Sequence, residues 1–218
     1  MTVQTGYINE IKNLKEKYKN QIQIYLGVEE DAFNPLNRND FDYIIGSCHY
    51  GFCNNNYYPI DSNYDYFKKC LEAFGNDHLA FAESYYSNFC DYIANRKPDI
   101  IGHFDLITKF DEMGETLFLG DTDYIKISEK YTKEALKSGS IFEINTGAIA
   151  RGIRTTVYPF KNLLHILKKE NAPIILSSDS HIIDTLDFGF EETKKYLKDI
   201  GFDKITVLVD NSFKEFDL

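Results

Sequence analysis

The stretch Asp99-Ile100-Ile101-Gly102-His103-Phe104-Asp105 shows the pattern from which the fold is predicted. A short apolar run rich in β-branched residues is typical of a buried strand, and this one ends in a histidine and an aspartate. Other apolar runs end in the same way, at Glu29, His49, Asn145 and Asp179. Segments with helical spacing of apolar residues separate the runs. This alternation predicts a parallel α/β sheet with helices outside it, either a barrel or an open doubly wound sheet.

The expected elements follow from hydrophobic periodicity and from the Gly and Pro positions. We expect strands over residues 21–28, 42–47, 99–102, 141–145, 173–177 and 204–209. We expect helices over residues 5–20, 63–74, 78–95, 122–138, 159–171 and 191–200, the last of them closed by Gly201. No long linker interrupts the series, so we expect residues 1–218 to form a single domain.

The composition and charge of the chain argue against some classes of binding partner. Asp and Glu number 34 against 24 Lys and Arg, and this acidic balance argues against general nucleic-acid binding. No apolar run approaches the roughly 18 residues of a membrane-spanning helix, so we expect no membrane partner. The N-terminus lacks the apolar core of a signal peptide. The cysteines form no C-x-x-C pair and are interpreted as free thiols in a reducing compartment, which predicts a cytoplasmic protein.

Side chains at the ends of successive parallel strands converge on one face of a barrel, where active sites are built. A single histidine after a strand is more often structural, but the recurrence of metal-ligand types at strand ends favours one shared site. Imidazole and carboxylate groups together bind Zn²⁺, Fe or Mn²⁺. The candidate metal ligands are Glu29, His49, His103, Asp179 and His181. By contrast, His78 and His165 fall within helical patterns, where surface or packing roles are expected.

Five segments in this order resemble the PHP (polymerase and histidinol phosphatase) superfamily. The segments are Gly27–Glu29, Gly46–His49, Ile101–Asp105, Glu143–Thr146 and Ser178–His181. Within the superfamily the sequence is similar to the histidinol-phosphatase branch. The string Ile-Gly-His-Phe-Asp-Leu and the Glu-Ile-Asn-Thr segment followed by Tyr158-Pro159 support that closer assignment.

The resemblance implies a distorted (β/α)7 TIM-like barrel of the PHP type that holds up to three metal ions and hydrolyses a phosphomonoester. By matching motifs, Glu29 would bridge two ions, and His49 and His103 would complete one of those sites. Asp179 would belong to the second site and His181 to the third, and either residue could act in catalysis by assisting proton transfer.

The resemblance also implies that an arginine after the strand ending at Asn145 binds the substrate phosphate. Arg151 is the preferred candidate and Arg154 the second. Asn145 itself is expected either to line the pocket or to cap the next turn, and the sequence leaves these two roles open.

The sequence departs from the family pattern at its beginning. The family opens with a strand ending in an H-x-H motif, and a second early unit supplies another histidine; neither motif is present here. The expected barrel is therefore N-terminally incomplete, and only the Glu29–His49–His103 site keeps all its expected protein ligands. An open flank would expose strand edges and favour self-association.

The leading functional prediction is hydrolysis of L-histidinol phosphate to L-histidinol and phosphate, a step of histidine biosynthesis. Its expected partner is a small phosphorylated substrate. One alternative is a PHP phosphoesterase or nuclease with another substrate. Another is a metal-binding fragment with impaired catalysis, because the chain as written is expected to be a poor phosphatase.

Overall fold

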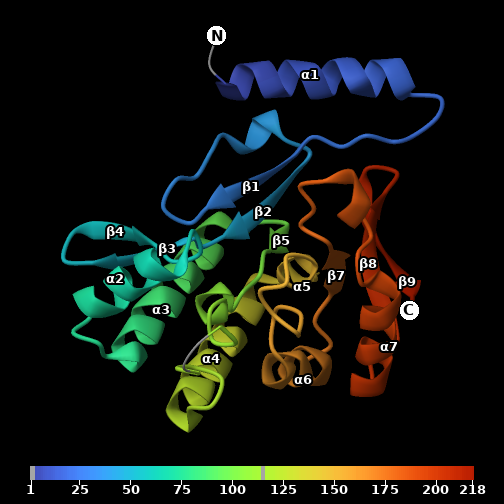
Figure 1. Cartoon of the computed structure of the whole chain (residues 1–218). Coiled ribbons are helices and arrows are strands. Elements are labelled where there is room, and N and C mark those ends of the chain that lie inside the picture. The colour runs from blue at the N-terminus through green and yellow to red at the C-terminus, as the bar shows by residue number, and fades with distance from the viewer. Residues whose placement is uncertain (1–2, 114–115) are drawn as a thin grey trace.

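A five-stranded sheet forms the centre of the computed structural model, which describes residues 3–113 and 116–218. Its strands are all parallel and lie in the order β1 (Gly27–Asp31), β2 (Tyr43–Ser47), β5 (Ile100–Ile101), β6 (Ile141–Asn145) and β7 (Ile174–Ser177). Figure 1 shows these strands crossing the middle of the molecule. The predicted parallel α/β sheet is confirmed.

The register brings the carboxyl ends of the strands to one edge of the sheet. Asp31 pairs with Ser47 at the ends of β1 and β2, and Asn145 pairs with Ser177 at the ends of β6 and β7. The polar residues that follow β2, β5 and β7 therefore emerge on the same side.

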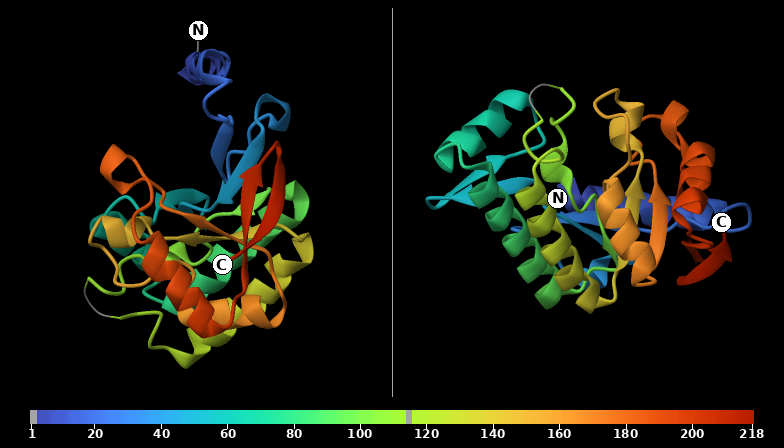
Figure 2. Two further views of the ribbon diagram at one scale, coloured as in Figure 1. Left: turned by 90° about the vertical axis from the view of Figure 1, so that its right-hand side faces the viewer. Right: turned by 90° about the horizontal axis from the view of Figure 1, so that it is seen from below.

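Helices cover the sheet in sequence order. The helix α3 (His78–Arg96) packs against α4 (Thr122–Ala135), α4 packs against α6 (Lys161–Lys169), and α6 packs against α7 (Phe190–Ile200). Figure 1 shows them below the sheet, and the right view of Figure 2 shows them from that side. Their inward side chains join those of β5 and β6 in one apolar core that extends from Cys48 to Phe202. Burial of this apolar area is the main force that holds the helices on the sheet.

A hairpin that the sequence analysis missed follows β2. It consists of β3 (Tyr50–Cys53) and β4 (Asn56–Pro59), joined by Asn54 and Asn55 at φ angles of 50° and 61°. Asparagine tolerates this left-handed conformation, which two-residue hairpin turns require. The helix α2 (Tyr64–Ala73) follows, with the Asn63 side chain as its N-cap.

The last predicted strand does not extend the sheet. Residues 204–209 form β8 (Lys204–Val209), which pairs antiparallel with β9 (Ser212–Asp217). The two-residue turn Asp210-Asn211 folds β9 directly back onto β8, so the backbone groups of β8 bond within this hairpin. β8 packs beside β7 without joining its ladder.

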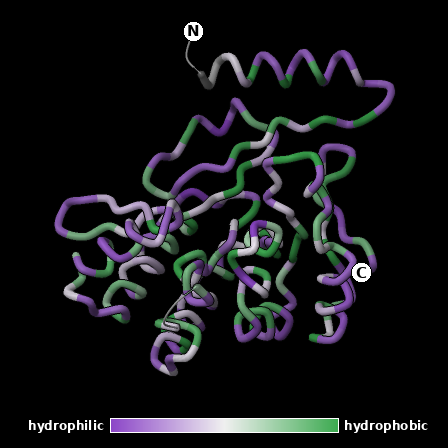
Figure 3. The backbone as a smooth tube through the Cα atoms, viewed as in Figure 1, coloured by the Kyte–Doolittle hydropathy of each residue, from purple (hydrophilic) through white to green (hydrophobic). Residues whose placement is uncertain are grey.

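The N-terminal helix α1 (Val3–Tyr18) lies apart from the other helices, above the strands in Figure 1 and in the left view of Figure 2. Figure 3 shows polar and apolar residues alternating along it. An ion pair between Lys15 and Asp42 ties it to the chain just before β2.

The expected strand over residues 21–28 begins later, because β1 starts only at Gly27. The preceding segment instead bonds through its side chains to the β8–β9 turn. The Gln23 amide nitrogen donates to Asp210 Oδ1 at 3.0 Å, and the Tyr25 hydroxyl accepts from the Asn211 N–H at 3.3 Å. Glu29 therefore lies within β1 rather than after it.

Short helical turns complete the structure: η1 (Arg38–Asp40), η2 (Leu106–Thr108), η3 (Leu136–Ser138), α5 (Gly147–Ala150) and η4 (Ile183–Thr185). Among the helices that the structure describes, none has the length and apolarity needed to cross a membrane.

Candidate active site

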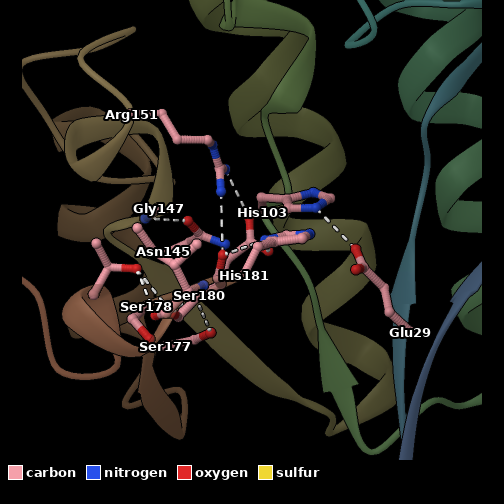
Figure 4. Close-up of polar contacts among 12 residues, drawn as sticks. Glu29, His103, Asn145, Gly147, Arg151, Ser177, Ser178, Ser180 and His181 are labelled. Carbon is pink, nitrogen blue, oxygen red and sulfur yellow. Dashed lines mark hydrogen bonds and ion pairs between the residues drawn. The ribbon is translucent and has the colours of Figure 1, made fainter.

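Three predicted ligand residues form a tight cluster at the carboxyl edge of the sheet. The Glu29 Oε1 atom lies 3.0 Å from His103 Nε2 and 3.2 Å from His49 Nε2. One donor atom from each of the three residues lies within 4.8 Å of the other two. Figure 4 shows Glu29 reaching from β1 toward the His103 ring. Two imidazole nitrogens and a carboxylate oxygen are a ligand set that suits Zn²⁺ and related ions.

Close approach of β5 to β2 makes this cluster possible. The Gly102 N–H donates to the Gly46 carbonyl at 2.9 Å, which continues the ladder up to the residue before His103. A Cβ atom at Gly102 would lie 2.5 Å from Ser47 Oγ, so a larger residue would push the two strands apart. Glycine is therefore required at this position to bring His103 beside His49.

Carboxylates behind the cluster hold both the ring and the main chain of His49 and the main chain of His103. The Asp31 Oδ2 atom lies 3.2 Å from His49 Nδ1 and also accepts the His49 backbone N–H at 2.9 Å. Glu143 accepts the backbone N–H of His103 at 2.7 Å, and the Asn145 side chain donates to the same carboxylate. A carboxylate on Nδ1 leaves Nε2 of His49 free to face Glu29, as is usual for a metal-binding histidine.

The charges in the cluster stabilise an ionised Glu29 and favour protonation of the two histidines when no ion is bound. Burial opposes the charge on Glu29, but its hydrogen bonds to His103 and His49 lower its pKa well below the usual range. Burial likewise opposes the charge on His49, but the carboxylates of Asp31 and Glu29 raise its pKa to about 10. The pKa of His103 is also raised, mainly by Glu29 against the effect of burial. A divalent ion would replace these protons, so the residues fit a metal site.

Arg151, Asp179 and His181 form another wall of the same cavity. Arg151, just after α5, places Nη2 2.8 Å from Asp179 Oδ2 and Nη1 3.1 Å from the Asp179 carbonyl oxygen. His181 Nδ1 lies 3.0 Å from that carbonyl oxygen, and its ring is largely exposed. Figure 4 shows Arg151 and His181 on loop segments separate from the strand β1 that carries Glu29.

The cavity between the two walls has a volume of about 290 Å³. Of the five predicted ligands, the structure brings the donor atoms of three within 4.8 Å of one another, and Asp179 and His181 line the same cavity without joining this cluster. The lining residues are Glu29, His49, Asp61, His103, Leu106, Lys109, Arg151, Tyr158, Asp179 and His181.

Two predicted substrate-binding residues do not line this cavity. The Asn145 side chain is buried, and its Oδ1 atom accepts the Gly147 N–H at 2.8 Å, so it caps the turn after β6. The Arg154 side chain is fully buried beneath Tyr158, with its guanidinium carbon 4.2 Å from the centre of that ring. The prediction that Arg154 contacts the substrate phosphate is therefore wrong, and this residue has a structural role instead.

That structural role is support of the cavity wall. Arg154 Nη1 donates to Thr108 Oγ1 at 2.6 Å, and Nη2 donates to Thr156 Oγ1 at 3.1 Å. Thr108 in turn donates to the Asp105 carbonyl at 2.8 Å. Arg154 thus holds the loop after His103 together, and this loop carries Lys109 into the cavity.

Three polar cavity residues escaped the sequence analysis as site candidates: Asp61, Lys109 and Tyr158. Asp61 was missed because it lies after the unpredicted β3–β4 hairpin, which closes through a bond from the Ile60 N–H to the His49 carbonyl at 2.9 Å. The Asn54-Asn55 pair was the available signal for that hairpin. Tyr158 was noted only as part of a motif.

Other titratable residues have structural roles. Asp105 accepts the Phe160 N–H at 3.0 Å and makes no hydrogen bond to His103. Cys48 is fully buried, and burial raises the pKa of its thiol, as expected for a packing residue. His78, at the start of α3, pairs with Asp121 at 2.8 Å.

Comparison with known proteins agrees with this geometry. Residues 4–147 match the PHP domain family. A Schizosaccharomyces pombe protein named "probable histidinol-phosphatase" is 31% identical, and the match covers 93% of this chain and 68% of that protein. The histidinol-phosphatase of Bacillus subtilis is 23% identical over 85% of this chain and 73% of its own length.

Solved structures show the same fold. A crystal structure of histidinol phosphate phosphatase from Lactococcus lactis, complexed with zinc, L-histidinol and phosphate, superposes with a TM-score of 0.65 at 18% identity. That match covers 98% of this chain and 80% of the other. A structure from Listeria monocytogenes gives a TM-score of 0.68 at 16% identity, over 88% of this chain and 76% of the other. These architectures are consistent with the predicted distorted TIM-like barrel. The chain belongs to the PHP domain family and, within it, to the histidinol-phosphatase branch.

Proposed function

We propose that this protein is a metal-dependent phosphomonoesterase that hydrolyses L-histidinol phosphate to L-histidinol and phosphate. The observation that carries the proposal is that the Glu29–His49–His103 cluster and Arg151 line one cavity. A metal-ligand set and a guanidinium in the same cavity suit the binding of a dianionic phosphoryl group.

The chain's own residues supply holding and orientation. Glu29, His49 and His103 would hold the first ion, with Asp31 fixing the His49 ring. A bound divalent ion lowers the pKa of a water molecule toward about 7 and neutralises phosphoryl charge. Arg151 would bind the phosphoryl oxygens, for which its planar guanidinium offers two parallel donors.

Asp179 and His181 are proposed as further metal ligands and as candidates for assisting proton transfer. Asp179 is now ion-paired with Arg151, so an incoming ion or phosphate would compete for these two side chains. His181 Nδ1 faces its own backbone turn, which leaves Nε2 for a ligand or for the leaving alcohol.

The substrate assignment draws on the relatives that carry the histidinol-phosphatase name and on the Lactococcus lactis complex. That complex contains zinc, which makes zinc the first choice of metal. Iron and manganese also accept imidazole and carboxylate ligands and remain proposed alternatives.

Self-association stays a prediction as well. In the described sheet, β1 pairs with β2 on one side and forms the sheet edge on the other. An edge strand can pair with a second copy of the chain. Light scattering across a concentration series measures this directly, and a constant monomer mass would contradict it.

The experiment for the proposed function measures phosphate release from L-histidinol phosphate by purified protein loaded with zinc. We expect turnover that chelators abolish and that Glu29→Ala or His103→Ala reduces at least about 100-fold, since each removes a preorganised electrostatic contact. His165→Ala, an exposed histidine on α6, is the matched control and should leave turnover unchanged. Hydrolysis of other phosphomonoesters without turnover of L-histidinol phosphate would refute the substrate assignment.

A further inference from the structure

Lys109 is a cavity residue to which neither the sequence nor the metal cluster assigns a role. It follows η2, six residues after His103, and its side chain is only 13% exposed. Lysine is seldom buried to this extent without a paired carboxylate. The low exposure of its side chain at the cavity wall therefore calls for a physical explanation.

The contacts of Lys109 leave its charge incompletely neutralised. Nζ donates to the Asp61 backbone carbonyl at 2.7 Å, whereas the nearest Asp61 carboxylate oxygen is 4.0 Å away. A carbonyl oxygen satisfies one of the three donors of an ammonium group and carries no full charge. The remaining donors are available to an anionic ligand in the cavity.

Arg151 lies near enough to affect the Lys109 charge. Burial lowers the pKa of Lys109, Asp61 opposes this effect, and the positive charge of Arg151 lowers the pKa further. Two cations that repel each other on the wall of one cavity form a site that an anion stabilises.

We infer that Lys109 is a phosphate-binding residue that holds the phosphoryl group together with Arg151 in this cavity. In the ligand-free protein the two cations contact groups of Asp61 and Asp179. A phosphate dianion would take over these contacts. The inference rests on the proposed function only in taking a phosphomonoester as the ligand.

The position of Lys109 is built into the fold. The guanidinium of Arg154 bonds to Thr108, the residue before Lys109, at 2.6 Å. The β3–β4 hairpin returns the chain so that the Asp61 carbonyl meets Nζ. Both features fix the ammonium in place, which favours binding because little side-chain entropy remains to be lost.

The test measures the dissociation constant of inorganic phosphate for the zinc-loaded protein by calorimetry. Lys109→Met keeps the length of the side chain and removes the charge, and we expect it to weaken phosphate binding by roughly 10- to 100-fold, as for loss of a charged hydrogen bond. Lys109→Arg should retain most of the affinity. Lys126→Met, on the exposed face of α4, is the matched control and should bind phosphate like the unmodified protein.

Unchanged phosphate affinity in Lys109→Met would overturn the inference, as would the absence of phosphate binding by the unmodified protein. If Lys109→Met proves unfolded by circular dichroism, Lys109→Gln takes its place with the same expectation. A loss of kcat on an alkyl phosphate with normal phosphate affinity and normal turnover of p-nitrophenyl phosphate would assign Lys109 to leaving-group protonation instead. Lys109-dependent phosphate binding without turnover of L-histidinol phosphate would contradict the proposed function and leave this inference standing.

Discussion

The Oδ2 atom of Asp31 lies 3.2 Å from Nδ1 of His49 and accepts the backbone N–H of the same residue at 2.9 Å. One carboxylate oxygen thus fixes both the main chain and the ring of His49. Asp31 ends β1 and His49 follows β2, so the contact depends on the parallel register of these strands. It presents Nε2 of His49 toward Glu29 before any ion arrives.

Removal of that carboxylate should weaken metal binding without removing a ligand. We expect Asp31→Asn to lower zinc affinity by about 10- to 100-fold, because the ring loses its fixed orientation and the imidazole becomes less basic. Competition with a chromogenic chelator measures the change. Asp123→Asn, an exposed carboxylate on α4, is the control. Equal zinc affinity in Asp31→Asn and the unmodified protein would show that the contact does not tune the site.

Zinc uptake should release protons at pH 7. The pKa of His49 is raised to about 10, so its ring carries a proton in the metal-free protein at neutral pH. A ligating imidazole must be neutral, so binding expels that proton and zinc affinity should rise with pH between about 6 and 9. Titration of zinc into weakly buffered protein with a pH indicator counts the protons. Zinc binding with no acidification would contradict the raised pKa.

The same raised pKa of His49 should make the metal-free protein less stable as the pH rises, whereas zinc affinity increases with pH. A raised folded-state pKa stabilises the fold fully below the unfolded value of about 6.5, and this contribution is lost as the pH rises toward about 10. We therefore expect the denaturation midpoint of the metal-free protein to fall between pH 7 and pH 9 more than that of Asp31→Asn. Urea titrations at the two pH values measure the difference.

A buried ion pair beneath β1 should matter more for stability than an exposed one. Arg96 bonds to Glu30 through Nε at 2.5 Å and Nη2 at 2.9 Å, and the Glu30 side chain is fully buried. Arg96→Ala would leave a buried carboxylate unpaired, at a cost of about 3–5 kcal/mol in the free energy of unfolding. Arg38→Ala breaks the exposed pair with Asp99 and should cost about 1 kcal/mol or less.

Urea denaturation measures both variants. Adding Glu30→Gln to Arg96→Ala should recover part of the loss, because the buried group is then neutral. Equal losses in Arg96→Ala and Arg38→Ala would mean that burial does not set the cost.

The sequence predicted the sheet and the metal cluster because both depend on a local and repeated signal, an apolar run followed by a ligand-type residue. Glu29, His49 and His103 meet because parallel strands end at one edge. This signal does not indicate how deeply the side chain of a loop residue is buried. Arg154 was therefore expected in the pocket, but it lies beneath Tyr158.

The two antiparallel hairpins were harder to predict than the parallel sheet. The β3–β4 hairpin depends on two asparagines in a left-handed turn, and the separation of β8 from the sheet depends on β9, which is mostly polar and exposed. Side-chain bonds of Gln23 to the β8–β9 turn likewise replaced an expected stretch of strand. These are contacts between segments distant in sequence, which periodicity does not encode.

The Asp61 carboxylate should distinguish a substrate with an amino group from one without. Asp61 lines the cavity, and the contact from Lys109 Nζ goes to its backbone carbonyl rather than to its side chain. The carboxylate makes only a long ion pair of 4.0 Å with that ammonium, so its oxygens can accept a second ammonium group, and L-histidinol phosphate carries one close to its ester oxygen. Asp61→Asn keeps the shape and the backbone contact but removes the charge. We expect KM for L-histidinol phosphate to rise about 10-fold or more, the cost of one charged hydrogen bond, while kcat changes less.

The comparison substrate is p-nitrophenyl phosphate, which has no amino group. Its KM should be the same in Asp61→Asn and in the unmodified protein, because only the phosphoryl group is shared between the two substrates. A parallel rise in KM for both substrates would instead mean that Asp61 acts through Lys109 on phosphate binding, since the two side chains lie 4.0 Å apart. Steady-state kinetics with both substrates on the same preparation therefore separates recognition of the amine from support of the phosphate contact.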